Sequence, residues 1–467
     1  MTIRRLLALL AVLGLIAAGC GGDRGEDESG GVSDGGSTET TEATETTEAA
    51  SGGAGDFGDL TGVCGPNAGG GAVADDPAET QGVTADAITV GTVSDPGFEG
   101  RPGLNQELFD TADAFVAWCN EAGGINGKQL EVNLHDAAIT EYQPVMAEAC
   151  ATDFGIIGSG AVQDNFWPDS GASCGLIDIA GFSVTPEKAG FAGQDVVAAR
   201  SVQPVPNPVD EFPVGAASIL AEEFPDAGDR VGILNADLDT LVTQAARVKE
   251  AYESIGFTVV HEATYNVLGE ANWAPFAAAV EEAGVTFLTF VGEGENLALF
   301  QQALDEIGYD VEVTLQDANF YDPTYLEAGG AATEGTFLRN AFWPFEEAAD
   351  NPATAQYIEQ VEAIDGKVAL LGAQAWSAWL LFAQSARDCD LADDLTRSCV
   401  LEAAASVTEW TGGGLHATTN PGANEGPDCT VVLQVQDGAF VRYAPTDEDY
   451  ACDPAYVAQL EGDFAVG

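Results

Sequence analysis

A strand–helix–strand pattern between Ile88 and Leu134 constrains the fold more than any other feature of this 467-residue chain. The apolar segment from Ile88 to Val93 predicts a buried strand, and a polar loop rich in Gly and Pro follows it. Apolar residues then recur at helical spacing from Phe109 to Cys119. Gly123 and Gly124 end this predicted helix, because glycine adopts the left-handed conformation that often follows a helix. A second strand, Gln129 to Leu134, completes a unit typical of α/β folds with parallel sheets.

The same alternation of strands and helices recurs in two series along the chain. A Pro-rich segment, Val202 to Pro208, separates the two series. About 400 residues are also too many for one hydrophobic core. We therefore predict an α/β fold with two doubly wound parallel-sheet lobes joined by three crossovers. Besides the two strands of the first unit, the predicted strands are 154–158, 176–180, 231–234, 257–260, 285–291 and 311–315.

The lobe boundaries follow from where the pattern breaks. We expect the first lobe to comprise residues 83–203 and 335–410, and the second lobe 204–334 and 411–467. The chain is expected to return to the first lobe near Gly335 to Trp343, with Gly335 to Leu338 as a first-lobe strand, and to cross again near Trp410 to Leu415. Alternating residues around an Asp437-Gly438 turn predict a C-terminal hairpin.

The first twenty residues have the pattern of a lipoprotein signal peptide. Arg4 and Arg5 precede an apolar core, Leu6 to Ala18, and Ala17-Ala18-Gly19-Cys20 resembles a lipobox with Cys20 as the lipidated residue. The core covers about 20 Å of helix, less than the ~30 Å hydrocarbon layer, so a permanent membrane span is disfavoured. An ordinary cleaved secretory peptide is the alternative.

Lipid on Cys20 would attach the protein to the outer face of the cell membrane, because a diacyl anchor carries two chains. Residues 21–62 consist mainly of Gly, Ser, Thr, Glu and Asp, with almost no apolar side chain to bury. This composition predicts a disordered, self-repelling spacer between the anchor and the globular body.

The charge balance is strongly acidic, with 76 Asp and Glu against 15 Lys and Arg. This excess excludes nucleic acid and bare anionic lipid as partners, because both are negatively charged. The acidic residues are scattered through predicted helices, which indicates a solvated surface rather than one acidic site.

The nine cysteines leave an even number once Cys20 is set aside, and an exported chain favours disulfides. Local pairing is expected for Cys389 with Cys399 and for Cys429 with Cys452. Cys150 with Cys174 and Cys64 with Cys119 are the favoured remaining pairs, although the sequence leaves these four open. Zinc ligation is disfavoured, because there is no Cys-x-x-Cys and the three His lie far apart. We expect no metal and no cofactor.

The segment Asn120-Glu121-Ala122-Gly123-Gly124-Ile125-Asn126-Gly127-Lys128 resembles the first-unit signature of type I periplasmic binding proteins, in the branch that serves branched-chain amino acid transport. Further similarities occur in the family's order at Gly158-Ser159, at Glu262 to Asn272 before Trp273, and at Glu334-Gly335-Thr336. The resemblance spans about residues 83–445. It implies two lobes that close around a small polar solute, an amino acid or a related compound, and deliver it to an ABC permease driven by an ATPase.

The resemblance also implies which residues hold the solute. Its carboxylate would be held by hydroxyl and N–H groups after the third and fourth strands, which here are Ser159, Gly160, Ser183 and Thr185. Free N–H groups at helix starts suit an anion without any basic residue. The alternative roles are helix capping for Ser159 and Thr185 and a turn position for Ser183.

An acid in the second lobe would hold the solute ammonium group. Glu293 or Glu295, after the predicted strand that ends at Val291, is the candidate, and Asp237 and Asp239 lie at the end of the preceding strand. The alternative for the two Glu is a favourable helix-start position. Arg101, in a long loop that departs from the family pattern, would hold an anionic solute or pair with Asp95 or Glu99.

Two other functions were considered, a membrane-anchored sensor of the same fold and an exported hydrolase. The sequence contains no Gly-x-Ser-x-Gly elbow and no His-Glu-x-x-His motif, which disfavours the hydrolase. Sensing and transport share the same predicted site. We therefore expect a binding protein that is not an enzyme, with a solute, an ABC permease and its ATPase as partners.

Overall fold

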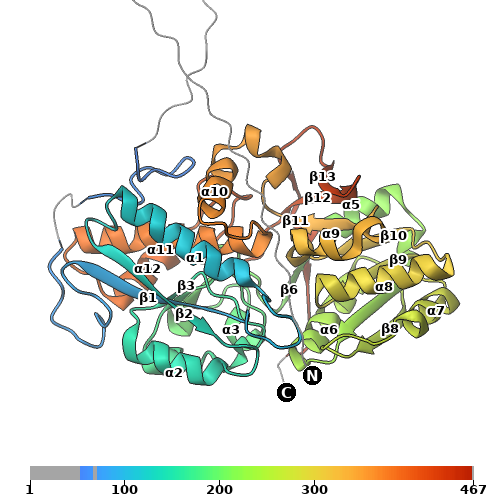
Figure 1. The fold of residues 1–467 in the computed structure, drawn as a ribbon, viewed down its shortest axis with the longest axis horizontal. Helices are drawn as coiled ribbons and strands as arrows, with labels where there is room; N and C mark the ends of the chain where they lie inside the picture. The colour runs from blue at the N-terminus through green and yellow to red at the C-terminus, as the bar shows by residue number, and fades with distance from the viewer. Residues whose placement is uncertain (1–52, 67–70, 465–467) are drawn as a thin grey trace, which may run out of the picture. The chain divides into compact units, whose positions relative to one another are not determined.

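The computed structural model describes residues 53–66 and 71–464. Two sheets organise this part of the chain (Figure 1). The five-stranded sheet is parallel throughout, with the order β2-β1-β3-β4-β5. Its strands are β1 (Ala87–Ser94), β2 (Gln129–Asp136), β3 (Ile156–Ile157), β4 (Asp178–Ile179) and β5 (Ser201–Val202).

The second sheet has the order β13-β12-β11-β10-β9-β7-β8, with β14 paired to β12. The strands from β8 to β11 are parallel, whereas β12 and β13 form an antiparallel hairpin. Its strands are β7 (Val231–Ala236), β8 (Val259–Tyr265), β9 (Phe287–Val291), β10 (Val313–Gln316), β11 (Phe337–Asn340), β12 (Cys429–Gln436), β13 (Ala439–Ala444) and β14 (Ala451–Cys452).

Helices cover both faces of each sheet, as parallel sheets require. We call the five-stranded sheet with its helices the first lobe and the other sheet with its helices the second lobe. First-lobe helices are α1 (Gln106–Ala122), α2 (Tyr142–Thr152), α3 (Pro186–Ala189), α4 (Val196–Ala199), α10 (Pro352–Glu362), α11 (Leu370–Leu391) and α12 (Arg397–Ala405). Second-lobe helices are α5 (Gly215–Glu223), α6 (Asp239–Ser254), α7 (Ala274–Ala283), α8 (Gly294–Ile307) and α9 (Pro323–Gly329).

Seven 3₁₀ helices and a small two-stranded sheet complete the described elements. Strands β6 (Glu211–Pro213) and β15 (Val457–Gln459) pair antiparallel, which joins the first crossover to the C-terminal segment. The 3₁₀ helices are η1 (Asp164–Phe166), η2 (Ala172–Cys174), η3 (Ala227–Asp229), η4 (Ala318–Phe320), η5 (Gly330–Thr333), η6 (Phe345–Asp350) and η7 (Pro454–Tyr456).

The structure confirms the predicted fold class and its opening unit. Helix α1 ends at Gly123, which adopts φ 115° and donates its N–H to the carbonyls of Asn120 and Cys119. A Cβ at this φ is strained, so glycine is favoured there. The C-terminal hairpin also forms as predicted, with positive φ at both Asp437 and Gly438.

Several boundaries differ from the expected ones. Gly335 to Leu338 was wrongly expected in the first lobe, because β11 pairs with β10 in the second sheet. The chain returns only after β11, towards η6 and α10. The third crossing also lies later than Trp410 to Leu415, since Asn424 still donates to first-lobe carbonyls of Ala189 and Phe191. Apolar periodicity marks a strand but does not identify its neighbours in the sheet.

The expected spacer is also shorter than residues 21–62. Phe57 is fully buried and packs against Trp118 and Trp376 of the first lobe. Residues 53–62 therefore belong to the folded body. Burial of the Phe57 ring stabilises this segment, although the residues around it are mostly small and polar. The signal peptide, Cys20 and residues 21–52 lie outside the described residues.

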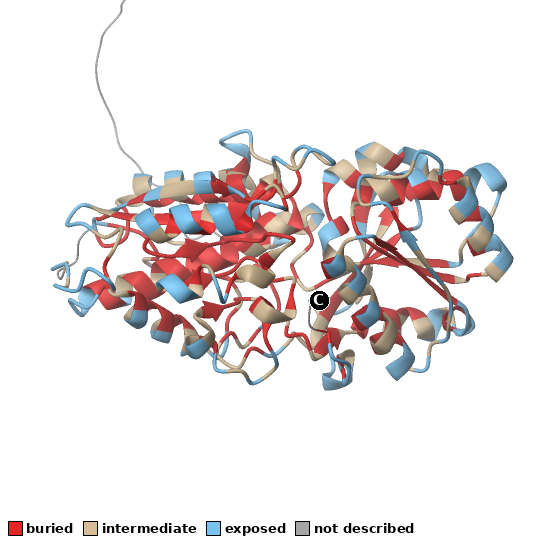
Figure 2. Ribbon diagram, turned by 90° about the horizontal axis from the view of Figure 1, so that it is seen from below, coloured by how far each residue is buried: buried red, intermediate tan, exposed pale blue. Residues whose placement is uncertain are grey.

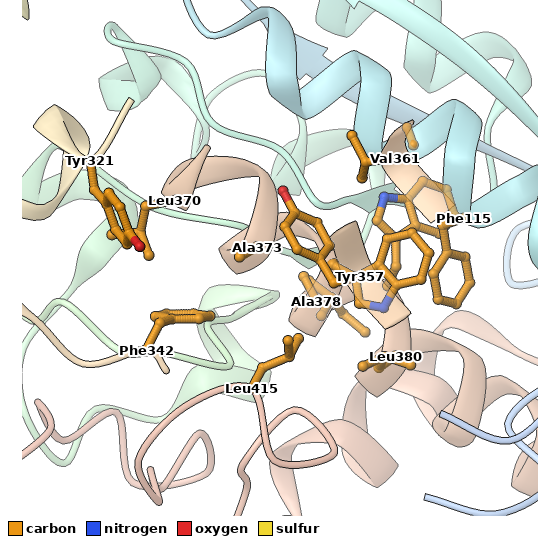
Figure 3. Packing of buried hydrophobic residues seen from close by; sticks show 14 of the residues in the cluster. Phe115, Tyr321, Phe342, Tyr357, Val361, Leu370, Ala373, Ala378, Leu380 and Leu415 are labelled. Carbon is orange, nitrogen blue, oxygen red and sulfur yellow. The ribbon is translucent and has the colours of Figure 1, made fainter. Parts of the chain in front are cut away.

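The first-lobe core is aromatic and centres on α11 (Figure 3). Trp376 lies 5.1 Å from Phe115 and 5.7 Å from Tyr357 between ring centroids. Figure 2 shows that the strands of both lobes are mostly buried, while exposed residues lie mainly on the outer helix faces and loops. The largest cluster of buried apolar residues includes residues of both lobes, among them Trp376 and Phe290, and smaller clusters lie elsewhere in the two lobes.

Four disulfides join the cysteines in the pairs that the sequence favoured. The pairs are Cys64–Cys119, Cys150–Cys174, Cys389–Cys399 and Cys429–Cys452, with Cα–Cα distances between 4.0 and 6.0 Å. Cys64–Cys119 attaches the N-terminal segment to α1. Such covalent closure stabilises a fold mainly by restricting the unfolded chain.

Candidate functional site

A cavity of about 240 Å³ lies between the two lobes. Its walls come from the loops that follow β1, β4, β9 and β10, from the first crossover and from the start of α11. In doubly wound sheets, ligands bind where the carboxyl ends of the strands meet at a switch in strand order. In the first sheet this switch lies between β1 and β3, and in the second between β7 and β9. The cavity therefore occupies the position that the topology favours for a ligand.

The Pro-rich first crossover forms one wall of the cavity, and Arg247 holds this segment in place. This buried side chain on α6 donates hydrogen bonds to the carbonyls of Val209, Pro208 and Glu211. Burial lowers the pKa of Arg247 to about 10, which still leaves it charged at neutral pH. Three charge-assisted bonds to the backbone hold the Pro-rich segment in place.

Most of the cavity wall is apolar. Its side chains come from both lobes and from the crossovers, so the cavity exists only where these parts meet. The apolar members include Val162, Phe182, Val205, Phe212, Leu241, Phe290, Phe320, Phe342 and Leu370. Apolar walls with a few polar groups are typical of small-molecule sites.

Six charged side chains form a cluster at one end of the cavity, which we call the inter-lobe ion cluster. It consists of Arg101, Glu107 and Lys367 from the first lobe and Glu293, Glu295 and Asp322 from the second. Arg101 contacts Glu293, lies 2.7 Å from Glu295 and lies 3.8 Å from Asp322.

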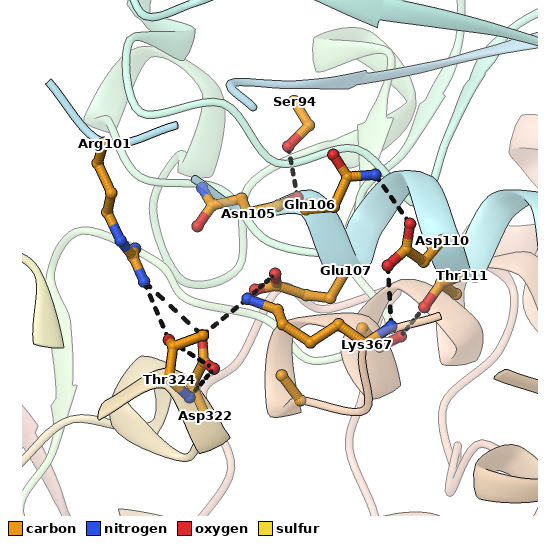
Figure 4. Close-up of polar contacts among 12 residues, drawn as sticks. Ser94, Arg101, Asn105, Gln106, Glu107, Asp110, Thr111, Asp322, Thr324 and Lys367 are labelled. Carbon is orange, nitrogen blue, oxygen red and sulfur yellow. Dashed lines mark hydrogen bonds and ion pairs between the residues drawn. The ribbon is translucent and has the colours of Figure 1, made fainter. Parts of the chain in front are cut away.

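Lys367 lies 2.6 Å from Glu107 and 2.8 Å from Asp322 (Figure 4). Each of the two cations therefore contacts an acid of the opposite lobe.

Burial and pairing act in opposite directions on the carboxyl groups of this cluster. Burial raises the pKa of Glu293 and Glu107 above their usual value, although Arg101 and Lys367 lower it in part. Burial also opposes ionisation of Asp322, but Lys367 and the Thr324 donors hold its pKa below 3.8. Repulsion between the carboxyl groups also raises the pKa of Glu293 and Glu107, because four carboxyl groups face only two cations.

A second ion pair lies at the ends of β10 and β11. Arg339 lies 2.7 Å from Asp317, and its guanidinium also stacks over Phe212 at 5.2 Å. A cation over an aromatic face gains from the ring quadrupole. The charge of Arg339 is thus paired with that of Asp317 within the cavity wall. Its Nε has no hydrogen-bond partner among the described residues.

Apart from Glu107 Oε2, which lies 2.6 Å from Lys367 Nζ, four polar atoms on the cavity wall have no hydrogen-bond partner among the described residues. They are Ser183 Oγ, Gln316 Nε2, Arg339 Nε and Gln374 Oε1. Ser183 and Gln316 are each only 1 % exposed. A buried polar group without a partner costs free energy, so these atoms are places where a ligand would supply the missing bond.

The predicted site residues divide into two sets. Ser183, Glu293 and Glu295 lie at the cavity or in the inter-lobe ion cluster. Ser159 lies instead in a buried network below the cavity, where its Oγ donates to Asp178 Oδ1 at 2.8 Å and accepts from Lys188 Nζ at 3.1 Å.

Thr185 is also occupied internally. Its hydroxyl and its N–H both donate to Asp164, at 2.6 and 2.9 Å. It begins α3 without a side-chain cap, so its hydroxyl serves Asp164 rather than the helix. Burial raises the pKa of Asp164 to about 6, while Lys188 and the Thr185 donors lower it.

Gly160 makes room rather than contacts. Its N–H donates to the carbonyl of Val93, and a Cβ built at Gly160 would lie 2.0 Å from the ring of Phe182, which lines the cavity. Asp237 and Asp239 are exposed and absent from the cavity wall; Asp237 accepts from the Val267 N–H.

Arg101 pairs across the lobes with Glu293 and Glu295, and not with Asp95 or Glu99, which was one of the two alternatives for this side chain. Asp95 is buried and accepts from the N–H groups of Ile139 and Val162. Sequence reasoning also missed Gln316, Arg339 and Phe342. Gln316 and Arg339 lie at strand ends, at the same edge of the second sheet as Glu293. This position could have identified them as site residues from the sequence.

Within residues 53–66 and 71–464, no group of three or more His, Cys, Asp and Glu side chains is placed to hold a metal ion. None of the helices within those ranges has the length and the apolar character that a membrane-crossing helix requires.

Solved structures with the same architecture come from several bacteria. A fatty acid ABC transporter substrate-binding protein from Thermomonospora curvata is 17 % identical with a TM-score of 0.67, and the match covers 81 % of this chain and 95 % of that one. A leucine-binding protein from Thermotoga maritima is 16 % identical with a TM-score of 0.59, covering 76 % and 99 %. A type 1 periplasmic binding protein from Bordetella pertussis is 18 % identical with a TM-score of 0.60, covering 76 % and 99 %.

These likenesses establish the fold. A search of curated proteins found no match. The model of the family described as periplasmic binding protein matches residues 203–439, which include strands β7 to β12 of the second sheet, the returning helices α10 to α12 and most of the cavity wall. The structure and this match confirm the resemblance drawn from the glycine-rich signature, and the chain belongs to the periplasmic binding protein family.

Proposed function

We propose that this protein is the solute-binding lipoprotein of an ABC importer, which captures a small molecule between its lobes and delivers it to the permease. The observation that supports this most is the cavity at the carboxyl ends of both sheets, with unpartnered buried groups from each lobe: Ser183 from the first and Gln316 from the second. The chain binds the solute and does not transform it.

The volume bounds the size of the solute. A cavity of about 240 Å³ has the size of a small-molecule site, so the solute is a small molecule rather than a polymer. Mass spectrometry of compounds released from gently denatured protein tests the proposal directly. Release of one compound of this size in stoichiometric amount supports it. The proposal is contradicted if the protein releases no compound and if no culture extract reduces its radius of gyration in solution scattering.

Among the hydroxyl groups expected at the site, Ser183 is the one we propose as a solute contact. Ser183→Ala is expected to weaken binding of the released solute by about 0.5–1.5 kcal/mol, a factor of about 2 to 10, because one hydrogen bond is lost. Calorimetric titration measures this change.

Thr185→Val is the matched control for Ser183→Ala, since the Thr185 hydroxyl donates to Asp164. It is expected to lower the melting temperature and leave affinity nearly unchanged. Equal affinity losses in the two variants contradict the assignment of Ser183.

The lipid anchor is proposed from Cys20 and the preceding lipobox. Cys20→Ala removes the thiol that receives the lipid, and the protein is expected to move from the membrane fraction to the soluble fraction. Two acyl chains are needed for stable attachment, so the loss should be nearly complete. Immunoblotting of both fractions measures it, and unchanged fractionation contradicts the anchor.

A further inference from the structure

The inter-lobe ion cluster places an internal cation on the two acids that the family resemblance assigned to a solute ammonium group. Glu293 directly precedes α8 and lines the cavity, and Glu295 lies in its first turn. Both carboxylates contact the guanidinium of Arg101. A solute ammonium group would have to displace that guanidinium.

The position of Arg101 is built into the loop after β1. The Phe98 N–H donates to the carbonyl of Asp95 at 3.1 Å, and the Arg101 N–H donates to the carbonyl of Phe98 at 3.1 Å. The Gly103 N–H donates to the carbonyl of Pro96 at 2.8 Å. These hydrogen-bonded turns fix the backbone of the loop. The position of the Arg101 guanidinium is therefore set by the backbone as well as by the side-chain conformation. Displacing it costs free energy, because the loop holds it close to three carboxylates at once.

Each carboxyl group that lines the cavity already has a partner within the described residues. Glu293 contacts Arg101, Asp317 contacts Arg339, and Glu107 and Asp322 contact Lys367. Glu211 accepts from the Gly426 N–H and from Gln459 Nε2. A solute ammonium group would therefore have to compete with these partners for a carboxylate, and a solute carboxylate would be buried beside an excess of acids, each at a cost in free energy.

The unpartnered groups on the wall are mainly donors. Ser183 Oγ, Gln316 Nε2 and Arg339 Nε can each donate a hydrogen bond, against one free acceptor, Gln374 Oε1. A carbonyl or ether oxygen satisfies such donors without bringing a charge. The rest of the wall is apolar and matches a hydrocarbon body.

We propose that the cavity takes an uncharged, largely apolar solute with oxygen acceptors, and that Arg101 excludes amine-bearing solutes by occupying Glu293 and Glu295. This inference rests on the proposed solute-binding function and narrows it to a solute class. It assigns Arg101 as a residue that determines specificity.

The first test titrates the full chain with three probes that share a branched body and differ at the head group. The probes are 4-methylpentanamide, 4-methylpentanoate and 3-methylbutylammonium. We expect the amide to bind at least tenfold more tightly than either charged probe, by calorimetry. An amide that binds no more tightly than the ammonium probe overturns the inference.

The second test is chemical rescue of Arg101→Ala. Ethylguanidinium at 10 mM is expected to raise the melting temperature of this variant by about 2 °C or more, relative to NaCl at equal ionic strength, because it refills the vacated place between Glu293 and Glu295. Arg101→Lys keeps the charge and should show no such rise.

The matched control is Lys249→Met, which removes one positive charge from an exposed pair with Glu262. It should not respond to ethylguanidinium. Absence of rescue in a folded Arg101→Ala variant, or equal rescue of the control, overturns the inference. If Arg101→Ala fails to fold, the titration of the unaltered chain decides. Tight binding of the ammonium probe overturns this inference alone, because it still demonstrates a solute-binding cavity.

Discussion

Replacing Lys188 by Met is expected to lower the free energy of unfolding by about 3–5 kcal/mol, because it removes one partner of a buried ion pair. Lys188 Nζ lies 3.3 Å from Asp178 Oδ2, and both side chains are at most 1 % exposed. The ammonium also lies 5.6 Å from the Trp167 ring and donates to Ser159 Oγ. Asp178 would keep only the hydroxyl donors of Ser159 and Ser201.

The pH dependence of this loss has a defined sign. Burial raises the pKa of Asp164 to about 6, and the charge of Lys188 opposes that rise. A carboxyl group whose pKa is raised on folding stabilises the fold at low pH, and that contribution disappears as the pH rises through the raised value. Without Lys188 the pKa of Asp164 rises further, so the loss of stability is expected to be larger at pH 7 than at pH 5.

Urea unfolding at the two pH values measures this loss. Lys249→Met is the control, because its partner Glu262 is exposed and such pairs contribute about 0–1 kcal/mol. Lys188→Met combined with Asp178→Asn should recover part of the stability, since position 178 then carries no unpaired charge. Equal effects of Lys188→Met and Lys249→Met would contradict the role of the buried pair.

Replacing Trp376 by Ala is expected to destabilise the protein by about 3–5 kcal/mol through the cavity that it leaves. Trp376 lies at the centre of the first-lobe aromatic core, with the rings of Phe57, Phe115, Trp118 and Tyr357 between 5.1 and 5.9 Å away. These neighbours come from three separate segments of the chain. The site cannot collapse easily, because the surrounding rings hold one another in place.

Trp376→Phe keeps an aromatic ring and leaves no buried indole N–H. It should therefore lower the free energy of unfolding much less than Trp376→Ala does. The indole N–H of Trp376 has no hydrogen-bond partner among the described residues. Thermal unfolding compares the two variants. A loss for Trp376→Ala that is no larger than for Trp376→Phe would contradict the central position of this side chain.

Local patterns in the sequence predicted the elements well where a single physical cause dominates. The glycine stop after α1, the almost entirely apolar strand β9 and the Asp437-Gly438 hairpin are such cases, because backbone conformation and burial on both faces leave a direct mark on composition. Strand β11 was assigned to the wrong lobe, since its residues carry no mark of their sheet neighbours.

The candidate site could be predicted only in part. Ser183 and Glu293 follow strands, and parallel strands bring such positions to one edge. Ser159 and Thr185 occupy equally plausible positions but are satisfied by Asp178 and Asp164. Hydrogen-bond partners distant in sequence decide whether a hydroxyl faces a ligand or the core, and a single sequence does not record them.

The amino-acid sequence by itself determined the two-lobed α/β class, the strand ends that can carry a site and an export pattern, because these depend on local composition and periodicity. Only the tertiary structure decided that Arg101 pairs with Glu293 and Glu295, residues about 190 positions away. That pairing depends on how the two lobes meet, and the burial it produces sets which charges remain free. The character of the cavity is therefore a property of the assembled lobes rather than of any one segment.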